Sequence, residues 1–272
     1  MFLIKNSPYS LFLEQAIAAS QRAAELVLSF YQKQNFQTVF KNNHLGPLTS
    51  ADLISNQVIC DYLSAHSSFP ILSEETKDDL SRLAAQYVWI VDPLDGTKEF
   101  LSRRPEFSIN VALVYEKKPI VGVIADPVSG SIYFAGQNMG AFLFSKNTLK
   151  SLHVSEKSEL DSLNIAVSRS HSHPALIEAL ARLKNLNIQK NGSALKYCYV
   201  ASGKIDASLR KTPLHEWDVA AADCILHEAH GKLTDIFGVP LTYNNKDTLV
   251  NSGLIASNAR LHQYFVDMFN QN

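Results

Sequence analysis

The chain has 272 residues, and 46% of them are hydrophobic, which is enough to fill the core of one or two domains. Its 25 basic and 26 acidic residues nearly balance, which argues against a broad nucleic-acid-binding surface and leaves a local anion site open. Three widely spaced cysteines without a CxxC pair favour a reducing compartment. The sequence has no run of roughly 18 apolar residues and no export signal, so we expect a cytoplasmic protein without a transmembrane segment.

The first part of the chain is predicted to form two helices followed by a group of strands. Apolar residues at helical spacing predict one helix from Ser7-Pro8 to Tyr31 and a second helix after Thr49. Short turns then separate strands over residues 88–91, 107–114, 120–125, 131–135 and 141–144. Because these strands are joined by such short turns, we expect an antiparallel meander.

From about residue 155, strands and helices alternate. The expected strands are 164–168, 186–189, 205–209 and 254–256. The expected helices are 174–183, 193–202, 216–230 and one from about residue 258, with Gly231 ending the third. We find no repeat or linker. The prediction is therefore a layered α/β protein, one compact unit of two α/β halves, residues 1–150 and 151–272, built from stacked sheets and helices.

Two carboxylates follow the strand over residues 88–91. Asp92 and Asp95 belong to the stretch DPLDGT and are expected at the C-terminal end of this strand, where α/β sheets bind ligands. Taken alone, a stretch rich in Pro, Asp and Gly is more typical of a turn. It lacks the acidic spacing of an EF-hand and the glycines of a Walker or dinucleotide-binding loop.

Three further acidic clusters have simple structural explanations when each is considered alone. Glu74-Glu75 can be a solvated strand end, Asp52 fits a helix capping box after Thr49, and Asp218 suits the first turn of a helix. Together the four clusters indicate one site whose ligands are all oxygen atoms. Such ligands favour Mg²⁺ or Mn²⁺ over Zn²⁺, and without a cation they would repel and raise each other's pKa values.

The combined stretches resemble the inositol monophosphatase superfamily of magnesium-dependent, lithium-sensitive phosphatases. The matching stretches are Glu74-Glu75, DPLDGT over 92–97 and WDVAA over 217–221. Within the superfamily, three stretches are similar to the 3'(2'),5'-bisphosphate nucleotidase (CysQ-type) branch: KEF over 98–100, VSRSH over 167–171 and GSALK over 192–196. Inositol phosphatases more typically have Thr-Asn-Phe in place of KEF. The resemblance implies a five-layer αβαβα sandwich, with the metal site in the first half and nucleotide-recognition loops in the second.

The resemblance also implies roles for individual residues. The implied metal ligands are Glu74, Asp92, the Leu94 carbonyl, Asp95 and Asp218, which would hold two or three Mg²⁺ ions, with Mn²⁺ as a substitute. Asp52 and Thr97 would orient and deprotonate the attacking water, and Glu75 would support the metals. The implied substrate-binding residues are Glu74, Leu94, Asp95, Gly96, Thr97, Ser168, His171, Gly192, Lys196 and Asp218.

The expected activity is release of the 3'-phosphate of adenosine 3',5'-bisphosphate to give AMP, with 3'-phosphoadenylyl sulfate as a second candidate substrate. One alternative is an inositol or sugar monophosphatase that uses the same metal site, and a more distant one is a non-catalytic metal- or nucleotide-binding protein. The expected partner is a small nucleotide and not a nucleic acid. Lys196 is expected to bind the 5'-phosphate, unless it is a solvated helix lysine. A cytoplasmic enzyme of this kind can also associate peripherally with the inner membrane face, and the sequence does not predict the oligomeric state.

Overall fold

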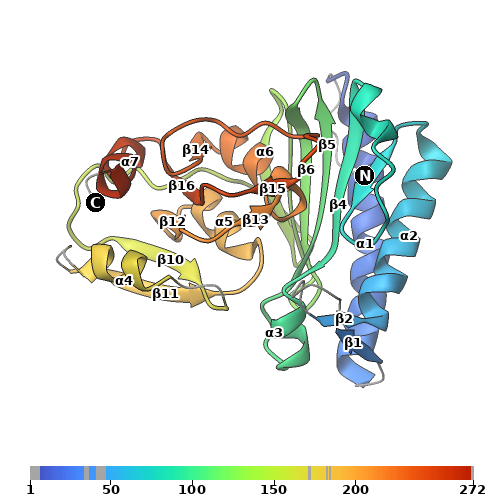
Figure 1. Cartoon of the computed structure of the whole chain (residues 1–272), viewed down its shortest axis with the longest axis horizontal. Coiled ribbons are helices and arrows are strands. Elements are labelled where there is room, and N and C mark those ends of the chain that lie inside the picture. Colours follow the sequence, from blue (N-terminus) through green and yellow to red (C-terminus); the bar gives the residue numbers. More distant parts are fainter. Residues whose placement is uncertain are drawn as a thin grey trace.

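Two β-sheets alternate with three layers of helices (Figure 1). The computed structural model describes residues 7–33, 37–40, 47–170, 173–181, 183 and 185–270. The layers are, in order, the pair α1 and α2, a seven-stranded sheet, the pair α5 and α6, a five-stranded sheet, and the pair α4 and α7. This order confirms the five-layer αβαβα sandwich. Among the described residues, none of the helices combines the length and the hydrophobicity of a membrane-spanning segment.

The seven-stranded sheet is a meander in which each strand pairs with the next one along the chain. Its strands are β3 (Ile71–Ser73), β4 (Tyr87–Asp95), β5 (Ser108–Tyr115), β6 (Lys118–Asp126), β7 (Ser131–Gly136), β8 (Gly140–Ser145) and β9 (Thr148–Ser151). β3 and β4 are parallel, and every later pair is antiparallel. The predicted antiparallel meander is confirmed, although β9 is not among the predicted strands.

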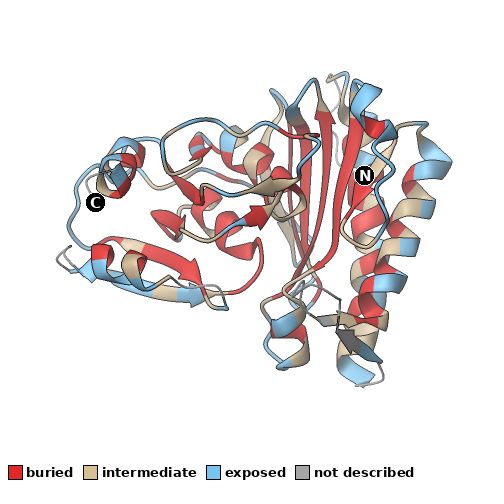
Figure 2. Ribbon diagram, viewed as in Figure 1, coloured by how far each residue is buried: buried red, intermediate tan, exposed pale blue. Residues whose placement is uncertain are grey.

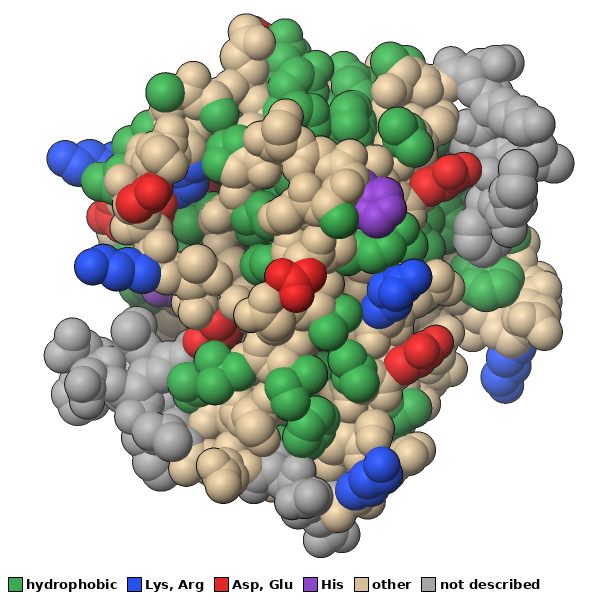
Figure 3. Space-filling model, turned by 90° about the vertical axis from the view of Figure 1, so that its right-hand side faces the viewer, with side chains coloured by type: hydrophobic (Ala, Val, Ile, Leu, Met, Phe, Trp, Pro, Cys, Tyr) green, Lys and Arg blue, Asp and Glu red, His purple; other side chains and the backbone are tan. Residues whose placement is uncertain are grey.

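Helices α1 (Ser10–Lys33) and α2 (Ser50–His66) cover the outer face of this sheet. Ala16, Ala19 and Ala23 of α1 are fully buried, and their small side chains let this helix lie close to the strands. Figure 2 shows this buried stripe along α1, and Figure 3 shows that side chains of both charges are scattered over the outer surface of the helix layer. The helix pair therefore shields the outer face of the seven-stranded sheet from solvent.

The five-stranded sheet has both parallel and antiparallel pairs. Its strands are β10 (Asn164–Ser168), β11 (Asn187–Asn191), β12 (Ala207–Arg210), β14 (Gly231–Thr234) and β16 (Leu254–Asn258). β10 is parallel to both β11 and β12, whereas β16 is antiparallel to β12 and β14. Helices α5 (Leu195–Ala201) and α6 (Ala220–Glu228) pack between the two sheets, and α4 (Pro174–Ala181) and α7 (His262–Asn270) cover the far face.

Short elements lie around these layers. They are β1 (Thr38–Phe40) paired with β2 (Pro47–Thr49), β13 (Leu214–His215) paired with β15 (Leu249–Val250), the helix α3 (Thr97–Leu101), and the 3₁₀ turns η2 (Ser81–Ala84) and η3 (Glu216–Asp218). All three cysteines are free.

The single helix predicted over residues 216–230 is wrong. Val219 leaves the helical region, with φ −136° and ψ −22°, and separates η3 from α6. The Val219 N–H donates to the carbonyl oxygen of Glu216 three residues back, which closes η3 as a 3₁₀ turn, and α6 begins with the bond from the Asp223 N–H to the carbonyl oxygen of Val219. Gly231 does not end the helix, because His230 takes the left-handed conformation with φ 66° and Gly231 begins β14.

The two halves of the chain are joined where α6 rests on β6. A Cβ atom at Gly122 of β6 would lie 2.4 Å from the carbonyl oxygen of Ala221 and 2.9 Å from Cβ of Cys224. These distances are too short for real contacts, so glycine is required for α6 to approach the sheet this closely. This contact fixes the helix that follows Asp218 against the sheet that carries Asp92 and Asp95.

We predict that Gly122→Ala lowers the free energy of unfolding by about 1–3 kcal/mol, because α6 must move away from β6. Gly136→Ala on the neighbouring strand is the matched control, since the atoms nearest to its added methyl group all belong to the flexible side chain of Met139. Chemical denaturation of both variants measures the difference. An equal loss in the two variants would contradict the requirement for close contact at Gly122.

Candidate active site

The end of β4 brings two carboxylates to one place. In a regular strand, residues three positions apart point to opposite faces of the sheet. The pairing of β4 with β5 is regular up to Asp92 and becomes irregular before Asp95. The backbone N–H of Leu94 donates a hydrogen bond to Oδ1 of Asp92 at 3.1 Å. This local irregularity lets both Asp side chains reach the same site.

Asp218 joins these two residues from the second half of the chain. One carboxylate oxygen from each of Asp92, Asp95 and Asp218 lies within 4.8 Å of the other two. His215 donates its backbone N–H to Asp218 at 2.7 Å, and Ala194 donates its backbone N–H to Asp95 at 2.5 Å. The three carboxylates, called the Asp cluster below, are therefore held by backbone donors from both halves.

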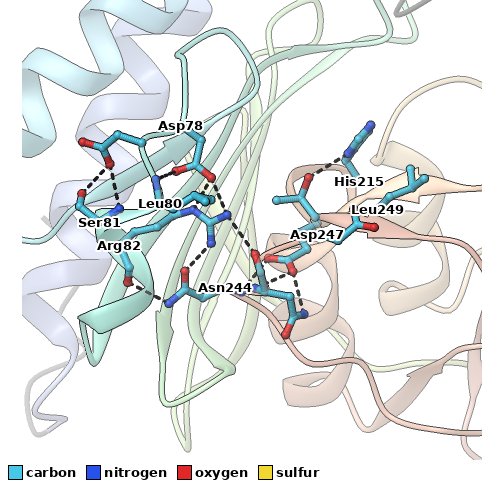
Figure 4. A network of polar contacts seen from close by, with 12 residues as sticks. Asp78, Leu80, Ser81, Arg82, His215, Asn244, Asp247 and Leu249 are labelled. Carbon is cyan, nitrogen blue, oxygen red and sulfur yellow. Dashed lines mark hydrogen bonds and ion pairs between the residues drawn. The ribbon is translucent and has the colours of Figure 1, made fainter.

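A buried network fixes the turn that carries Asp218 (Figure 4). The carboxylate of Glu216 accepts hydrogen bonds from the backbone N–H groups of Asn244 and Asn245, at 2.7 and 3.0 Å. The Arg82 side chain donates to the Asn244 side chain at 2.6 Å and to the Asp78 carboxylate at 2.7 and 3.0 Å. Arg82 and Glu216 are 2% and 1% exposed, so their hydrogen bonds to Asn244 lie away from bulk water, where such bonds are strong, whereas Asp78 lies at the surface. The network ties η3 to the edge of the seven-stranded sheet.

The Asp cluster is electrostatically unfavourable as it stands. Burial raises the pKa of Asp92 well above its usual value, and the charges of Glu74, Asp95 and Asp218 raise it further. Burial and the charge of Asp218 raise the pKa of Asp95 to about 6. Asp92 is 1% exposed, and its Oδ2 atom has no hydrogen-bond partner in the described part of the chain. A divalent cation among these oxygens would satisfy Oδ2 and remove the repulsion, so the residues fit a magnesium site.

Asp52 and Thr97 form a second part of the site. Thr97 Oγ1 lies 3.1 Å from Oδ1 of Asp52 and 3.2 Å from the carbonyl oxygen of Leu94. The other carboxylate oxygen of Asp52 accepts hydrogen bonds from the N–H and hydroxyl groups of Thr49, so the predicted capping box is confirmed. Burial raises the pKa of Asp52. One carboxylate thus caps α2 and also contacts Thr97.

A pocket of about 320 Å³ lies over the Asp cluster. Most of the residues that the sequence predicts for the site line it: Glu74, Asp92, Leu94, Asp95, Gly96, Thr97, Ser168, Gly192, Lys196 and Asp218. Asp52 contacts the pocket residue Thr97, whereas Glu75 is not among the lining residues and His171 lies outside the described residues. The structure therefore gathers most of the predicted residues in one place, and the metal-binding, catalytic and substrate-binding roles of all of them stay predictions.

Three basic residues line this pocket, Lys98, Lys196 and Arg210. Lys196 is 4% exposed and donates from Nζ to the carbonyl oxygen of Ser193 at 2.5 Å, so the alternative of a solvated lysine is wrong. Burial lowers the pKa of Lys196 to about 8, against the opposing effect of Asp95. Arg210, which sequence reasoning missed, lies at the end of β12 and donates to the carbonyl oxygens of Thr212 and Pro213. No sequence motif surrounds it, and only the pairing of β12 brings it to the pocket.

Nearly the whole chain is similar to known proteins. Residues 9–271 match the sequence model of the inositol monophosphatase family. The 3'(2'),5'-bisphosphate nucleotidase CysQ of Escherichia coli (strain K12) is 33% identical over 248 residues, which cover 90% of this chain and 99% of that protein. The crystal structure of CysQ from Bacteroides thetaiotaomicron, described as a bacterial member of the inositol monophosphatase family, superposes with a TM-score of 0.81. The two sequences are 34% identical, and the superposition covers 94% of this chain and 100% of the CysQ chain.

Repulsion within the Asp cluster should lower the free energy of unfolding when no metal is bound. Burial and repulsion raise the pKa of Asp95 to about 6 in the folded protein, above the value of about 4 expected in the unfolded chain. Protonated Asp95 is therefore favoured by folding and ionised Asp95 is not. The free energy of unfolding keeps this contribution below about pH 4 and loses it as the pH rises through about 6. At pH 7.5 in EDTA, Asp95→Asn should therefore raise the free energy of unfolding by about 1–3 kcal/mol. Added Mg²⁺ should stabilise the wild type more than the variant.

Thermal denaturation at pH 4 and pH 7.5, with EDTA or Mg²⁺, measures these effects. Asp267→Asn is the control, because it removes an exposed carboxylate on α7 far along the chain from the cluster. Equal stability of Asp95→Asn and the wild type in EDTA at pH 7.5 would show that the cluster is not under electrostatic strain.

Proposed function

The chain belongs to the inositol monophosphatase family, and on that premise we propose that it is a magnesium-dependent phosphatase that converts adenosine 3',5'-bisphosphate to AMP and phosphate. The observation that carries the proposal is the convergence of Asp92, Asp95 and Asp218 in a pocket that also holds Lys196 and Arg210. Carboxylates suit divalent cations, and the two basic side chains suit a substrate with a second anionic group.

The proposed metal site uses the Asp cluster together with Glu74 and the carbonyl oxygen of Leu94; both residues line the pocket. Two or three Mg²⁺ ions, or Mn²⁺ in their place, would neutralise the phosphate, lower the pKa of a bound water and stabilise the leaving oxygen. The three free cysteines of the chain fit the reducing cytoplasm, which is the location that we propose.

Asp52 and Thr97 are proposed to move the proton of the attacking water. When the Thr97 hydroxyl donates to Asp52, its own lone pairs are available to accept a proton from a water in the pocket. Burial raises the pKa of Asp52 and makes this carboxylate a better base at neutral pH. Its other oxygen is fixed by Thr49, so the side chain stays oriented toward Thr97.

The nucleotide is proposed to occupy the part of the pocket formed by the second half of the chain. Ser168, Gly192 and Lys196 line that part, and His171 is proposed to contribute as well. Lys196 is our candidate for binding the 5'-phosphate, and Arg210 supplies a second positive charge nearby. The same contacts would accept 3'-phosphoadenylyl sulfate, which carries an anionic group at the same end.

Phosphate release from a panel of three substrates tests this proposal: adenosine 3',5'-bisphosphate, adenosine 3'-monophosphate and inositol 1-phosphate, each with Mg²⁺ or with EDTA. We expect the bisphosphate to be the best substrate and activity to disappear in EDTA, because the carboxylates alone cannot neutralise a phosphate. A preference for inositol 1-phosphate would overturn the nucleotidase proposal. Full activity in EDTA would overturn the metal site.

The same panel applied to Lys196→Met tests how the second phosphate is bound. A charge-assisted hydrogen bond is worth about 1.5–3 kcal/mol, so kcat/KM for the bisphosphate should fall roughly ten- to a hundredfold. The 3'-monophosphate, which lacks the 5' group, should be little affected. Lys204→Met, which removes an exposed lysine just after α5, is the control. Equal losses on both substrates would show that Lys196 acts on the Asp cluster and not on the 5'-phosphate.

A further inference from the structure

An ion pair that the proposed chemistry does not use joins the two halves of the chain beside the pocket. Glu106 lies between α3 and β5, and Arg169 follows directly after β10. Arg169 donates from Nε and Nη2 to the two carboxylate oxygens of Glu106, each at 2.7 Å. Both side chains are partly buried, at 28% and 24% exposure. Two parallel hydrogen bonds of this kind fix the relative orientation of the groups as well as their distance.

The pair holds a segment of the second half, residues 190–194. The backbone N–H of Gly192 donates to Oε2 of Glu106 at 2.9 Å, and the Arg169 side chain donates to the carbonyl oxygen of Lys190. The backbone N–H of Arg169 also donates to the carbonyl oxygen of Asn191 at 3.0 Å. Each of the two side chains therefore binds its partner and the backbone of the 190–194 segment at the same time.

The fit of the 190–194 segment against the first half is tight. A Cβ atom at Gly192 would lie 2.7 Å from the carbonyl oxygen of Glu106 and 2.7 Å from Cγ of Glu99. Glu99 is 4% exposed and accepts a hydrogen bond from the hydroxyl of Ser170 at 2.5 Å. Glycine at 192 is thus required by close approach, and α3 contacts the second half from a second side.

The other end of the segment reaches the Asp cluster. The N–H of Ala194 donates to Oδ2 of Asp95, and the carbonyl oxygen of Ser193 accepts from Lys196. The segment therefore connects Glu106 at one end to the candidate metal ligand Asp95 at the other. Gly192, Ser193 and Lys196 all line the pocket along this path. A shift of the segment would move the residues that face the substrate relative to the Asp cluster.

We propose that Glu106 and Arg169 are positioning residues that hold the 190–194 segment at the distance from the Asp cluster that the nucleotide requires. This inference rests on the proposed function for the identity of the substrate. Neither residue lines the pocket, so neither is expected to contact the substrate. Their loss should weaken substrate binding more than Mg²⁺ binding, because Ala194 is the one donor of the segment to the Asp cluster, whereas Leu94 and His215 hold Asp92 and Asp218 from outside it.

Steady-state kinetics and hydrogen exchange of Arg169→Met test the proposal. We expect KM for adenosine 3',5'-bisphosphate to rise about tenfold or more, because small misplacements of binding groups are costly. The Mg²⁺ concentration that gives half-maximal activity should change less than twofold. Hydrogen exchange of peptides that contain residues 190–194 should become faster, whereas exchange in β4 should not change. Glu106→Gln should give the same pattern, and the double variant should be no worse than either single variant, since the two residues act as one unit.

Two further variants serve as controls. Arg169→Lys keeps the charge but cannot donate two parallel hydrogen bonds, so its KM should lie between those of the wild type and Arg169→Met. Arg104→Met removes an exposed arginine near Glu106 and should leave KM and exchange unchanged. An unchanged KM, unchanged exchange in the 190–194 segment, or parallel losses of Mg²⁺ affinity and overall stability would overturn the proposal. If the wild type hydrolyses no nucleotide, the proposed function fails, and the exchange measurement still decides whether the pair positions the segment.

Discussion

Repulsion among the three carboxylates of Asp92, Asp95 and Asp218 is the interaction on which the arrangement of this molecule depends. Like charges that share a buried site separate unless the surrounding structure holds them or a cation lies between them. Here they come from both halves of the chain and converge within 4.8 Å. The fold therefore has to supply enough rigidity to keep this cluster assembled, and it does so mainly with backbone hydrogen-bond donors.

The donors come from elements that are themselves tightly fixed. Leu94 and Ala194 donate their N–H groups to Asp92 and Asp95, and the turn that carries Asp218 is anchored by the buried side chains of Glu216 and Arg82. Behind this cluster, α6 packs directly on the seven-stranded sheet. The five layers of the sandwich therefore act as a support that brings strand ends and helix starts from both sheets to one pocket, which is where α/β proteins commonly bind ligands.

Sequence reasoning succeeded where local physical chemistry decides the outcome. The short turns between strands predicted the meander, and the position of Asp92 and Asp95 after a buried strand predicted where their side chains gather. It failed where a tertiary contact overrides a local preference. The helical pattern over residues 216–230 gave no sign of the break at Val219, where η3, tied to Asn244 and Asn245 through Glu216, ends and α6 begins. Arg210 and the Glu106–Arg169 pair were missed for a related reason. Their positions depend on the parallel pairing of β10 with both β11 and β12, which a single sequence does not reveal.

The most direct test of the central claim is to locate metal ions in crystals of the protein grown or soaked with Mn²⁺, by anomalous X-ray diffraction. The account predicts anomalous peaks among the carboxylate oxygens of Asp92, Asp95 and Asp218, with at least one ion in contact with Oδ2 of Asp92. Crystals of Asp95→Asn under the same conditions should show weaker peaks or none at this position. Saturating Mn²⁺ that leaves the cluster without a peak, or that binds only elsewhere on the wild-type protein, would contradict the claim that these carboxylates are held together to bind metal.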